Sequence, residues 1–506
     1  MEKKVLEGSD LEVSVSRPIE KRGLEEVNQE DVAPKNIIDK LGLRFNAEIR
    51  GVERVPEDQR SKGSMLTPFF IYASPNLAIA ALSTGALGTA SFGLDFWTCT
   101  IVIIIWSFIG ALPVGLFAVF GMKFGLRQQI LSRYFTGNIM GRVFALFNVI
   151  SCIGWNAINI IPSVELLAQL GPLPPWAGCL IFVVITCVIA MWGYKYIHLY
   201  ERYSGIPNFI IYLVIIARLT MSKNFTFGTM GKGTAEAGNV LTFIALIFGF
   251  VAGWCPSAAD FMVYLPSNTK SWKVFWPMVF GLSLPSMFAL ILGAACGSAT
   301  ATDPDWADAF ESDSIGGLVY AILVPNSLHG FGKFCCVILA LSGVANNLPG
   351  SYSLSLAIQA VWSPLAKFPR IGWCFVGNFL SLALSIPAYY KFSATMSNFL
   401  SIIGYNVSIY IGISLSEILV IRRSWSAYDF SNFDDGSTVP IGIAGVFTFC
   451  CGVATTVLSM NQTWYSGVIS QKFGEYGGEV SFELNIVACF IIYSIVRPIE
   501  KKYFKR

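Results

Sequence analysis

The sequence predicts an all-α membrane protein with twelve transmembrane helices. Its 506 residues have a mean hydropathy of +0.59, and 54% of them are hydrophobic whereas only 13% are charged. That composition is typical of a polytopic membrane protein. The apolar residues fall into twelve separate runs, and a membrane-spanning helix needs about 20 mostly apolar residues. Gly and Pro interrupt the first and the sixth run, which divides the chain into two five-helix repeats followed by two additional helices.

The predicted spans lie within a transmembrane domain of residues 65–498. The first repeat, residues 66–220, contains Leu66–Ala90, Phe96–Phe120, Val143–Leu170, Trp176–Trp192 and Ile206–Thr220. The second repeat, residues 241–421, contains Leu241–Leu265, Val274–Ser298, Phe331–Val361, Ile371–Tyr389 and Ser397–Ile421. The additional helices, within residues 440–496, are Pro440–Met460 and Val480–Val496.

Hydrophilic segments flank the transmembrane domain. Residues 1–64 have mixed charge and few aromatic side chains, so we expect a largely disordered N-terminal tail. A short tail, residues 499–506, ends the chain. We expect both tails to be cytoplasmic by the positive-inside rule, because the loop between the second and third spans has no acid and four basic residues, Lys123, Arg127, Arg133 and Arg142. Candidate glycosylation sequons at Asn224 and Asn461 fall on the predicted outer side.

Each repeat begins with a span that is not expected to be a continuous helix. The first contains Ser74-Pro75-Asn76, and the sixth contains Gly253-Trp254-Cys255-Pro256. Proline removes a helical hydrogen bond and crowds the preceding turn. In hydrocarbon, freed backbone groups are tolerated only where they line a cavity or are buried in protein. Because each repeat has an odd number of helices, the two are inverted, and paired broken helices indicate a transporter site between them. Either proline alone is explained equally well as a bend in a packed helix.

Aromatic and amide side chains inside the third and sixth spans are candidates for binding a ligand. Trp155 and Asn159 are four residues apart and share a helix face. An indole stacks on a planar ring while an amide pairs with the edge of that ring, and Trp254 at the sixth-span break is a candidate for the second aromatic face. The alternatives are an interhelical hydrogen bond for Asn159 and space-filling beside Gly253 for Trp254.

The eighth span carries Asn346, Asn347 and Pro349 in its apolar centre. Polar side chains at this depth are costly unless they face a cavity. Because an amide both donates and accepts hydrogen bonds, one Asn is expected to read a ligand and the other to hold a helix that Pro349 opens. The alternative is that the pair only ties helices together.

Three acids lie within or near the spans and are candidates for a coupling group: Asp260, Glu417 and Glu165. An intramembrane acid is a functional hypothesis by default, although each of the three is also a candidate for an ion pair or a helix cap. The two histidines have no cluster of partner ligands and the twelve cysteines lie in or beside apolar runs, so we expect neither a metal site nor disulfides. Motifs for ATP binding or hydrolytic catalysis are also absent from the sequence, so we do not expect an enzyme or an ATP-driven pump.

Several short motifs, spread from Gly51 to the C-terminus, carry a family resemblance. They are Gly51–Pro56, Gly125–Gln128, Leu131–Tyr134, Gly154-Trp155, Gly253-Trp254, Ala259-Asp260, Val324–Ser327, Ala345–Pro349 and Arg497-Pro498. With these motifs the chain resembles the fungal purine-cytosine permeases of the nucleobase:cation symporter family. The resemblance implies a LeuT-like transporter fold with a 5+5 inverted repeat, a plasma-membrane location and proton-driven uptake without a cofactor. It also implies that the ligand is held by Trp155, Asn159, Trp254, Asn346, Asn347 and Pro349.

Two positions depart from the pattern of that family. Gly350 stands where members that take cytosine usually carry Asn, and Ala81 where they usually carry Ser. Each change deletes a hydrogen-bonding group, which alters discrimination between ligands. We therefore expect alternating-access import of a nucleobase such as cytosine, adenine, guanine or hypoxanthine, with the lipid bilayer and not nucleic acid as the other partner. The alternatives are import of pyridoxine on the same fold, a non-transporting sensor, or a channel.

Overall fold

A computed structural model describes residue 40 and residues 48–60, 66–430, 433, 435–436, 439–474 and 476–504. The principal helices are α2 (Thr67–Ala73), α3 (Ile79–Ala86), α4 (Phe96–Phe124), α5 (Gln128–Thr136), α6 (Asn138–Ala168), α7 (Pro175–Met191), α8 (Tyr194–Ser222), α9 (Thr234–Ala252), α10 (Trp272–Ser298), α11 (Pro304–Leu323), α12 (His329–Ala340), α13 (Ser342–Val361), α14 (Arg370–Tyr389), α15 (Phe392–Ser416), α16 (Ile443–Ser459) and α17 (Ser481–Phe504). A single hairpin of β1 (Asn461–Gln462) and β2 (Tyr465–Ser466) is the sheet structure of the described residues.

The predicted spans have helical counterparts. Nine helical segments among the described residues are long and apolar enough to cross a membrane. The shorter apolar helices α7 and α16 and the interrupted pair α2–α3 account for the remaining predicted spans. The prediction of an all-α membrane fold is therefore confirmed.

Local chemistry sets the ends of these helices, as α4 shows. The Asp95 side chain accepts hydrogen bonds from the backbone N–H groups of Trp97 and Thr98, both at 3.0 Å, at the start of α4. An acidic N-cap of this kind satisfies N–H groups that have no partner within the helix. Gly125 ends α4 in the left-handed region with φ 63°, a conformation that glycine adopts without the steric penalty of a Cβ.

Both predicted helix breaks are present. α2 ends at Ala73 and α3 begins at Ile79, while α9 ends at Ala252 and is followed by the short 3-10 turn η5 (Cys255–Ser257). Side chains from other helices satisfy the backbone around the second break. The Pro256 carbonyl accepts from Gln129 Nε2 at 2.6 Å and from Asn148 Nδ2 at 3.3 Å.

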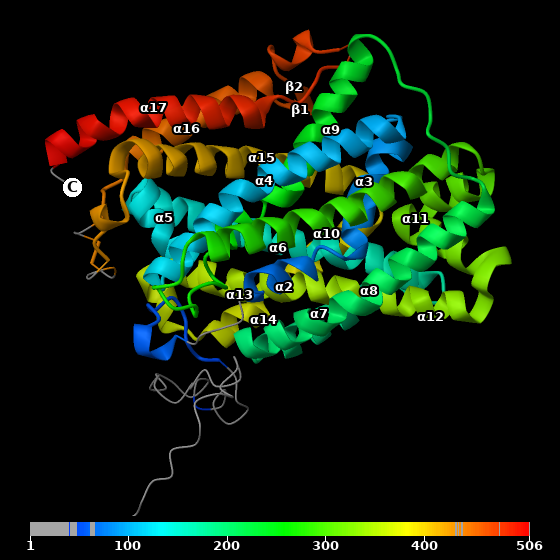
Figure 1. Cartoon of the computed structure of the whole chain (residues 1–506), viewed down its shortest axis with the longest axis horizontal. Helices are drawn as coiled ribbons and strands as arrows, with labels where there is room; N and C mark the ends of the chain where they lie inside the picture. The colour runs from blue at the N-terminus through cyan, green and yellow to red at the C-terminus, as the bar shows by residue number, and fades with distance from the viewer. Residues whose placement is uncertain are drawn as a thin grey trace, which may run out of the picture.

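The helices form an elongated bundle, in which α16 and α17 lie along one side next to α15 (Figure 1). The α3 helix packs against α10, and α6 packs against α13. Glycines allow the first of these pairs to approach closely, because a Cβ on Gly85 would lie 1.9 Å from the Leu290 carbonyl oxygen and a Cβ on Gly293 would lie 2.1 Å from that of Leu82. Small residues at such crossings are typical of membrane helices, whose association depends on close packing.

Three helical boundaries differ from the sequence prediction. α8 begins at Tyr194, twelve residues before the predicted fifth span at Ile206, because the hydropathy pattern is interrupted by charged residues that the fold nevertheless includes in the helix. α5 and α11 lie in segments predicted as loops, since both are too polar to be identified as spans. Within the segment expected to be a largely disordered tail, residues 48–60 have a defined path. The stretch 36–50, whose apolar residues recur with weak helical periodicity, lies mostly outside the described residues.

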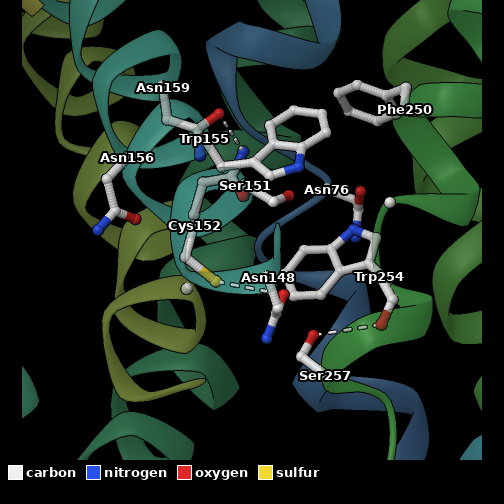
Figure 2. Close-up of a pocket in the computed structure, with 13 residues that line it drawn as sticks. Asn76, Asn148, Ser151, Cys152, Trp155, Asn156, Asn159, Phe250, Trp254 and Ser257 are labelled. Atoms are coloured by element: carbon white, nitrogen blue, oxygen red, sulfur yellow. Dashed lines mark hydrogen bonds between the residues drawn. The ribbon is translucent and has the colours of Figure 1, made fainter. Parts of the chain in front are cut away.

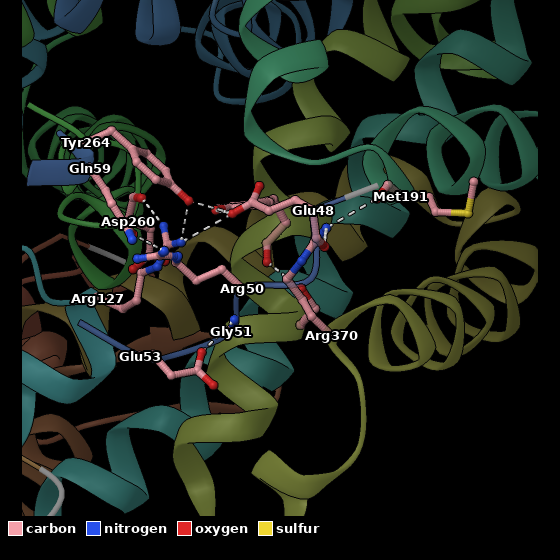
Figure 3. Close-up of polar contacts among 12 residues, drawn as sticks. Glu48, Arg50, Gly51, Glu53, Gln59, Arg127, Met191, Asp260, Tyr264 and Arg370 are labelled. Atoms are coloured by element: carbon pink, nitrogen blue, oxygen red, sulfur yellow. Dashed lines mark hydrogen bonds and ion pairs between the residues drawn. The ribbon is translucent and has the colours of Figure 1, made fainter. Parts of the chain in front are cut away.

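Glu48 ties the N-terminal segment to one end of the bundle (Figure 3). Its Oε1 accepts from the Tyr264 and Tyr352 hydroxyls at 2.6 and 2.9 Å and lies 3.5 Å from Arg127 Nη2. The Glu48 carbonyl accepts from Arg370 Nη2 at 2.9 Å. The C-terminal end of α17 lies at the same end of the bundle in Figure 1. The N-terminal segment thus joins the segment after α9 to α5, α13 and α14.

The close approach of α3 and α10 gives the first prediction. Gly85→Ala is expected to lower the melting temperature and the amount of folded protein, because the added methyl meets a backbone carbonyl that cannot rotate away and overpacking costs about 1–3 kcal/mol. The measurement is thermal unfolding of the detergent-solubilised protein followed by size exclusion. Gly330→Ala is the matched control, since a Cβ there meets nothing within 4 Å. Equal melting temperatures for the two variants would contradict this account of the packing.

Candidate functional site

A cavity lies where α6 and α13 meet the two helix breaks. Thirteen residues line it: Asn76, Asn148, Ser151, Cys152, Trp155, Asn156, Asn159, Phe250, Gly253, Trp254, Ser257, Asn346 and Gly350. Four of the six predicted ligand residues are in this lining, namely Trp155, Asn159, Trp254 and Asn346. The other two, Asn347 and Pro349, lie on α13 outside the lining. Figure 2 shows that α6 supplies one wall and that the segment after α9 supplies the opposite one.

The two indoles are half-buried and held by neighbouring rings. Trp155 makes edge contacts with Phe250 and Phe399, at centroid distances of 5.8 and 5.4 Å. Trp254 makes an edge contact with Tyr72 at 5.2 Å. Edge-to-face packing of this kind fixes ring orientation. Both indoles border the same cavity (Figure 2), as expected of two aromatic surfaces for one planar ligand.

A chain of amides joins α6 to α13 beside the indoles. Asn346 Nδ2 donates to Asn159 Oδ1 at 3.2 Å, and Asn159 Nδ2 donates to Asn347 Oδ1 at 3.0 Å. Asn347 Nδ2 in turn donates to the Asn156 carbonyl at 3.0 Å. Asn347 is fully buried and holds the two helices together, whereas Asn346 and Asn159 present their amides to the cavity. Asn346 thus lines the cavity and Asn347 does not, and contact of either one with a ligand remains a prediction.

Pro349 does not open the backbone as the sequence suggested. α13 is continuous from Ser342 to Val361 with Pro349 in its interior, and the interruption of the eighth span lies earlier, at Leu341 between α12 and α13. A membrane helix tolerates proline where neighbouring helices satisfy the freed group. Pro349 therefore shapes α13 without lining the cavity.

Asn156 was not among the predicted ligand residues, yet it lies in the cavity wall. Its Nδ2 donates to Ser351 Oγ at 3.1 Å and to Asn378 Oδ1 at 3.3 Å. Its Oδ1 is buried and has no hydrogen-bond partner. A Cβ on Gly350 would lie 2.8 Å from that oxygen, so the glycine avoids a close contact with this buried acceptor. The adjacency of Asn156 to Trp155 in the sequence was the available signal.

The two departures from the family pattern lie in different places. Gly350 is in the cavity wall. Ala81, on α3, is fully buried and is not in the lining. Of the two deletions, the one at Gly350 changes the surface that a ligand would meet.

Two of the three predicted coupling acids have well-defined partners. Asp260 accepts from the Gln128 backbone N–H at 2.8 Å and from Ser353 Oγ at 2.7 Å, and its carbonyl accepts from Arg127 at 2.6 Å. Glu417 forms ion pairs with Arg422 at 3.0 Å and with Arg497 at 3.4 Å. Neither of these acids lines the cavity.

The third acid, Glu165, lies near the end of α6 and packs against Gly316 of α11, with Asp313 close by. It is buried, and its Oε2 has no hydrogen-bond partner. Glu165 is likewise outside the cavity lining.

The remaining predicted positions have the following surroundings. Asn224 Nδ2 donates to Asp303 Oδ2 at 2.6 Å, and Asn461 begins the β1–β2 hairpin; glycosylation of either remains a prediction.

Within the described part of the chain, no three His, Cys, Asp or Glu side chains are grouped as a metal site would require. The twelve cysteines, all within the described residues, are free thiols. The cavity thus offers ring-stacking surfaces with amide donors and acceptors, which is the chemistry of reversible binding.

Comparison with known proteins identifies close relatives. The family described as permease for cytosine/purines, uracil, thiamine, allantoin matches residues 54–476. Purine-cytosine permease FCY21 of Saccharomyces cerevisiae is 44% identical over 96% of this chain and 92% of its own length. Purine-cytosine permease FCY2 of the same organism is 47% identical over 92% of this chain and 89% of its own. Vitamin B6 transporter TPN1, also from this yeast, is more distant, at 28% identity over 93% and 89% of the two chains.

A solved structure has the same fold. Mhp1, a nucleobase-cation-symport-1 family transporter in a closed conformation with bromovinylhydantoin bound, matches with a TM-score of 0.69 at 13% identity, over 90% of this chain and 96% of its own. Its inward-facing conformation matches with a TM-score of 0.65. These matches confirm the LeuT-like transporter fold predicted from the sequence.

The amide chain gives the second prediction. Asn347→Ala is expected to lower the free energy of unfolding by about 1–3 kcal/mol, because it leaves the buried Asn159 amide and Asn156 carbonyl without partners. Asn346→Ala removes a single donor at the cavity edge and is expected to change stability less. Thermal unfolding of both purified variants without ligand measures the difference. A larger loss for Asn346→Ala would reverse the assigned roles.

Proposed function

Because the chain belongs to the family of permeases for cytosine, purines, uracil, thiamine and allantoin, we propose that it is a secondary active transporter that imports purine nucleobases or cytosine across the plasma membrane together with protons. Alternating access of the two inverted repeats around a central cavity is the general mechanism of such folds. Two yeast relatives, 44% and 47% identical to this chain, carry the name purine-cytosine permease, which supports this choice of substrate class.

The observation that carries the proposal is the convergence of two indoles and three amides on one cavity. Trp155 and Trp254 offer faces for a flat heterocycle, and stacking of a base on an aromatic side chain contributes about 1–3 kcal/mol. Asn159 and Asn346 offer edge contacts. The unpaired Oδ1 of Asn156 is buried in the cavity wall, and a small shift of that side chain would offer it as an acceptor to an N–H group or an exocyclic amine of a nucleobase. A buried acceptor left unpaired by a ligand without that donor costs binding energy.

Membrane orientation is part of the proposal. The basic loop between α4 and α6 predicts that the end of the bundle containing Glu48 and the end of α17 faces the cytoplasm. In that orientation Asn224 and Asn461 face outward. The Glu48 cluster then closes the cytoplasmic side, because it bridges Arg127 to Tyr264 and Tyr352.

Uptake of labelled cytosine and adenine by fungal cells that lack their own nucleobase permeases tests the function. Saturable, protonophore-sensitive uptake with competition by hypoxanthine or guanine is the expected outcome. Efficient competition by pyridoxine alone, followed by uptake of labelled pyridoxine, would instead support the vitamin alternative, for which TPN1 is the relative. Ligand binding without flux by protein at the cell surface would indicate a sensor, and flux that does not saturate would indicate a channel.

Removal of one stacking surface gives a further prediction. Trp254→Ala is expected to weaken nucleobase affinity about tenfold or more, which corresponds to about 1.4 kcal/mol. The inhibition constant for unlabelled adenine, measured at equal surface expression, reports the change. Trp97→Ala is the control, because Trp97 is 56% exposed and lies outside the cavity. An unchanged inhibition constant for Trp254→Ala would exclude stacking on this indole.

A further inference from the structure

Glu201 is a buried acid that the sequence analysis did not identify as a candidate. The predicted fifth span began after it, but α8 includes it and leaves it only 1% exposed. Within the described part of the chain, neither carboxyl oxygen has a hydrogen-bond partner of normal geometry. Among the acids of the described residues, Glu201 alone has both oxygens buried in this way. The sequence signal was present, since an acid that interrupts an otherwise apolar stretch can still be part of the helix.

Glu201 lies at the joint between α8 and the break of the first span. The groups that face its carboxyl are the Ser74 hydroxyl, from the C-terminal end of α2, and the Tyr200 phenol on α8 itself. Ser74 Oγ lies 2.8 Å from Ser204 Oγ, one helical turn beyond Glu201. Gly205 allows this approach, because a Cβ there would lie 3.2 Å from Ser74 Oγ. No cation from α7, α10, α12 or α13 within the described residues pairs with the carboxyl.

The absence of a counter-charge determines the protonation state. An ionised carboxylate taken out of water without a partner costs several kcal/mol, so the carboxyl holds its proton while α2 is packed on α8. The other buried acids differ from it. Asp260 accepts two hydrogen bonds and lies beside Arg127, and Glu417 has two arginines. Both therefore have fixed partners that Glu201 lacks.

A groove reaches the same face of α8. It is lined on α8 by Tyr200, Ser204 and Asn208 and on the facing helices by Trp192, Leu341 and Ser342. Asn208 is buried, and its Nδ2 has no hydrogen-bond partner, which leaves a polar group for water. The groove lies near the Glu48 end of the bundle, because Gly193 at the start of α8 packs against the Glu48 side chain.

The break at Ser74 also connects Glu201 to the substrate cavity. Asn76, two residues further along, lines that cavity, and its Nδ2 donates to the Tyr72 carbonyl at 2.7 Å. Tyr72 packs on Trp254. The Ile79 backbone N–H donates to Ser342 Oγ at 3.0 Å, at the groove. Movement of α2 in response to substrate therefore changes the surroundings of Glu201.

We infer that Glu201 is the group that carries the coupled proton; this inference rests on the proposed function. The carboxyl is protonated while α2 is packed against α8. When α2 moves away and water enters along the groove, the O–H bond breaks, the proton passes to water on the cytoplasmic side, and the carboxylate remains in a hydrated site. The empty carrier then returns with its carboxylate ionised and α2 held away from α8, and the next proton is taken up from the outer side before α2 packs against α8 again, so that each cycle imports one proton.

The test compares Glu201→Gln, which mimics the neutral form, with wild type in proteoliposomes. For Glu201→Gln we expect exchange of labelled adenine across the membrane at a rate within about threefold of wild type. We also expect loss of the accumulation that an imposed pH gradient drives, at least tenfold in wild type. Glu483→Gln is the matched control and is expected to retain gradient-driven accumulation, because Glu483 on α17 also has a buried carboxyl oxygen without a hydrogen-bond partner but lines neither the groove nor the cavity.

The outcomes separate the two proposals. Gradient-driven accumulation that persists in Glu201→Gln while wild type behaves as expected would overturn the role of Glu201 alone. Wild-type exchange that ignores the pH gradient would overturn proton coupling and the role of Glu201 with it. No exchange of any nucleobase by folded wild type would overturn the proposed function.

A second measurement covers the case in which Glu201→Gln does not fold. Adenine added to purified protein in weakly buffered solution is expected to cause proton uptake by wild type, followed with a pH-indicator dye. Glu201→Asp keeps a titratable carboxyl and is expected to keep this proton uptake, whereas Glu201→Gln and Glu201→Ala are expected to lose it. Equal proton uptake by wild type and Glu201→Ala would overturn the inference.

Discussion

The structure depends on satisfying the backbone polar groups that the two broken helices release inside the membrane. Each unsatisfied group in hydrocarbon costs several kcal/mol, and side chains from α5 and α6 provide the partners. Gln129 and Asn148 donate to the Pro256 carbonyl, while Gln128 Oε1 accepts from the Ala259 backbone N–H at 3.1 Å. The irregular segment after α9 is thereby fixed against α5 and α6. Trp254, which begins this segment, owes its position in the cavity wall to that arrangement.

The same amides that hold the fold also make the cavity selective. The Nδ2 group of Asn156 donates to Ser351 and Asn378, so only its Oδ1 acceptor is left without a hydrogen-bond partner. Asn159 is held from both sides by asparagines of α13. A preorganised amide loses less entropy on binding than a free one, and its orientation decides which ligand edge it accepts. The sequence alone left a structural role and a binding role as alternatives for these side chains. In the structure, one arrangement is compatible with both roles.

The sequence was sufficient for the spans, the two breaks and the indoles, because hydropathy and proline act locally along the chain. It was insufficient where the surroundings of a side chain depend on how two helices pack against each other. Whether Asn346 or Asn347 faces the cavity depends on the rotation of α13 against α6. That Gly350 avoids a close contact with Asn156 Oδ1 depends on the approach of two helices. Glu201 was missed because a charged residue ends a hydropathy window even when the helix continues through it.

A carboxyl buried without a partner has an energetic consequence that a paired one lacks. Removing the proton of Glu201 while α2 is packed against α8 costs several kcal/mol, whereas a change of one pH unit is worth about 1.4 kcal/mol. Protonation of Glu201 therefore strongly favours the packing of α2 against α8. By reciprocity, the packing of α2 raises the affinity of Glu201 for the proton. Asp260 and Glu417, by contrast, have hydrogen-bond or ion-pair partners that compensate their charge. Coupling between substrate and proton requires a group whose surroundings change with the helix that the substrate moves, and in the described residues that helix meets an unpaired acid at Glu201.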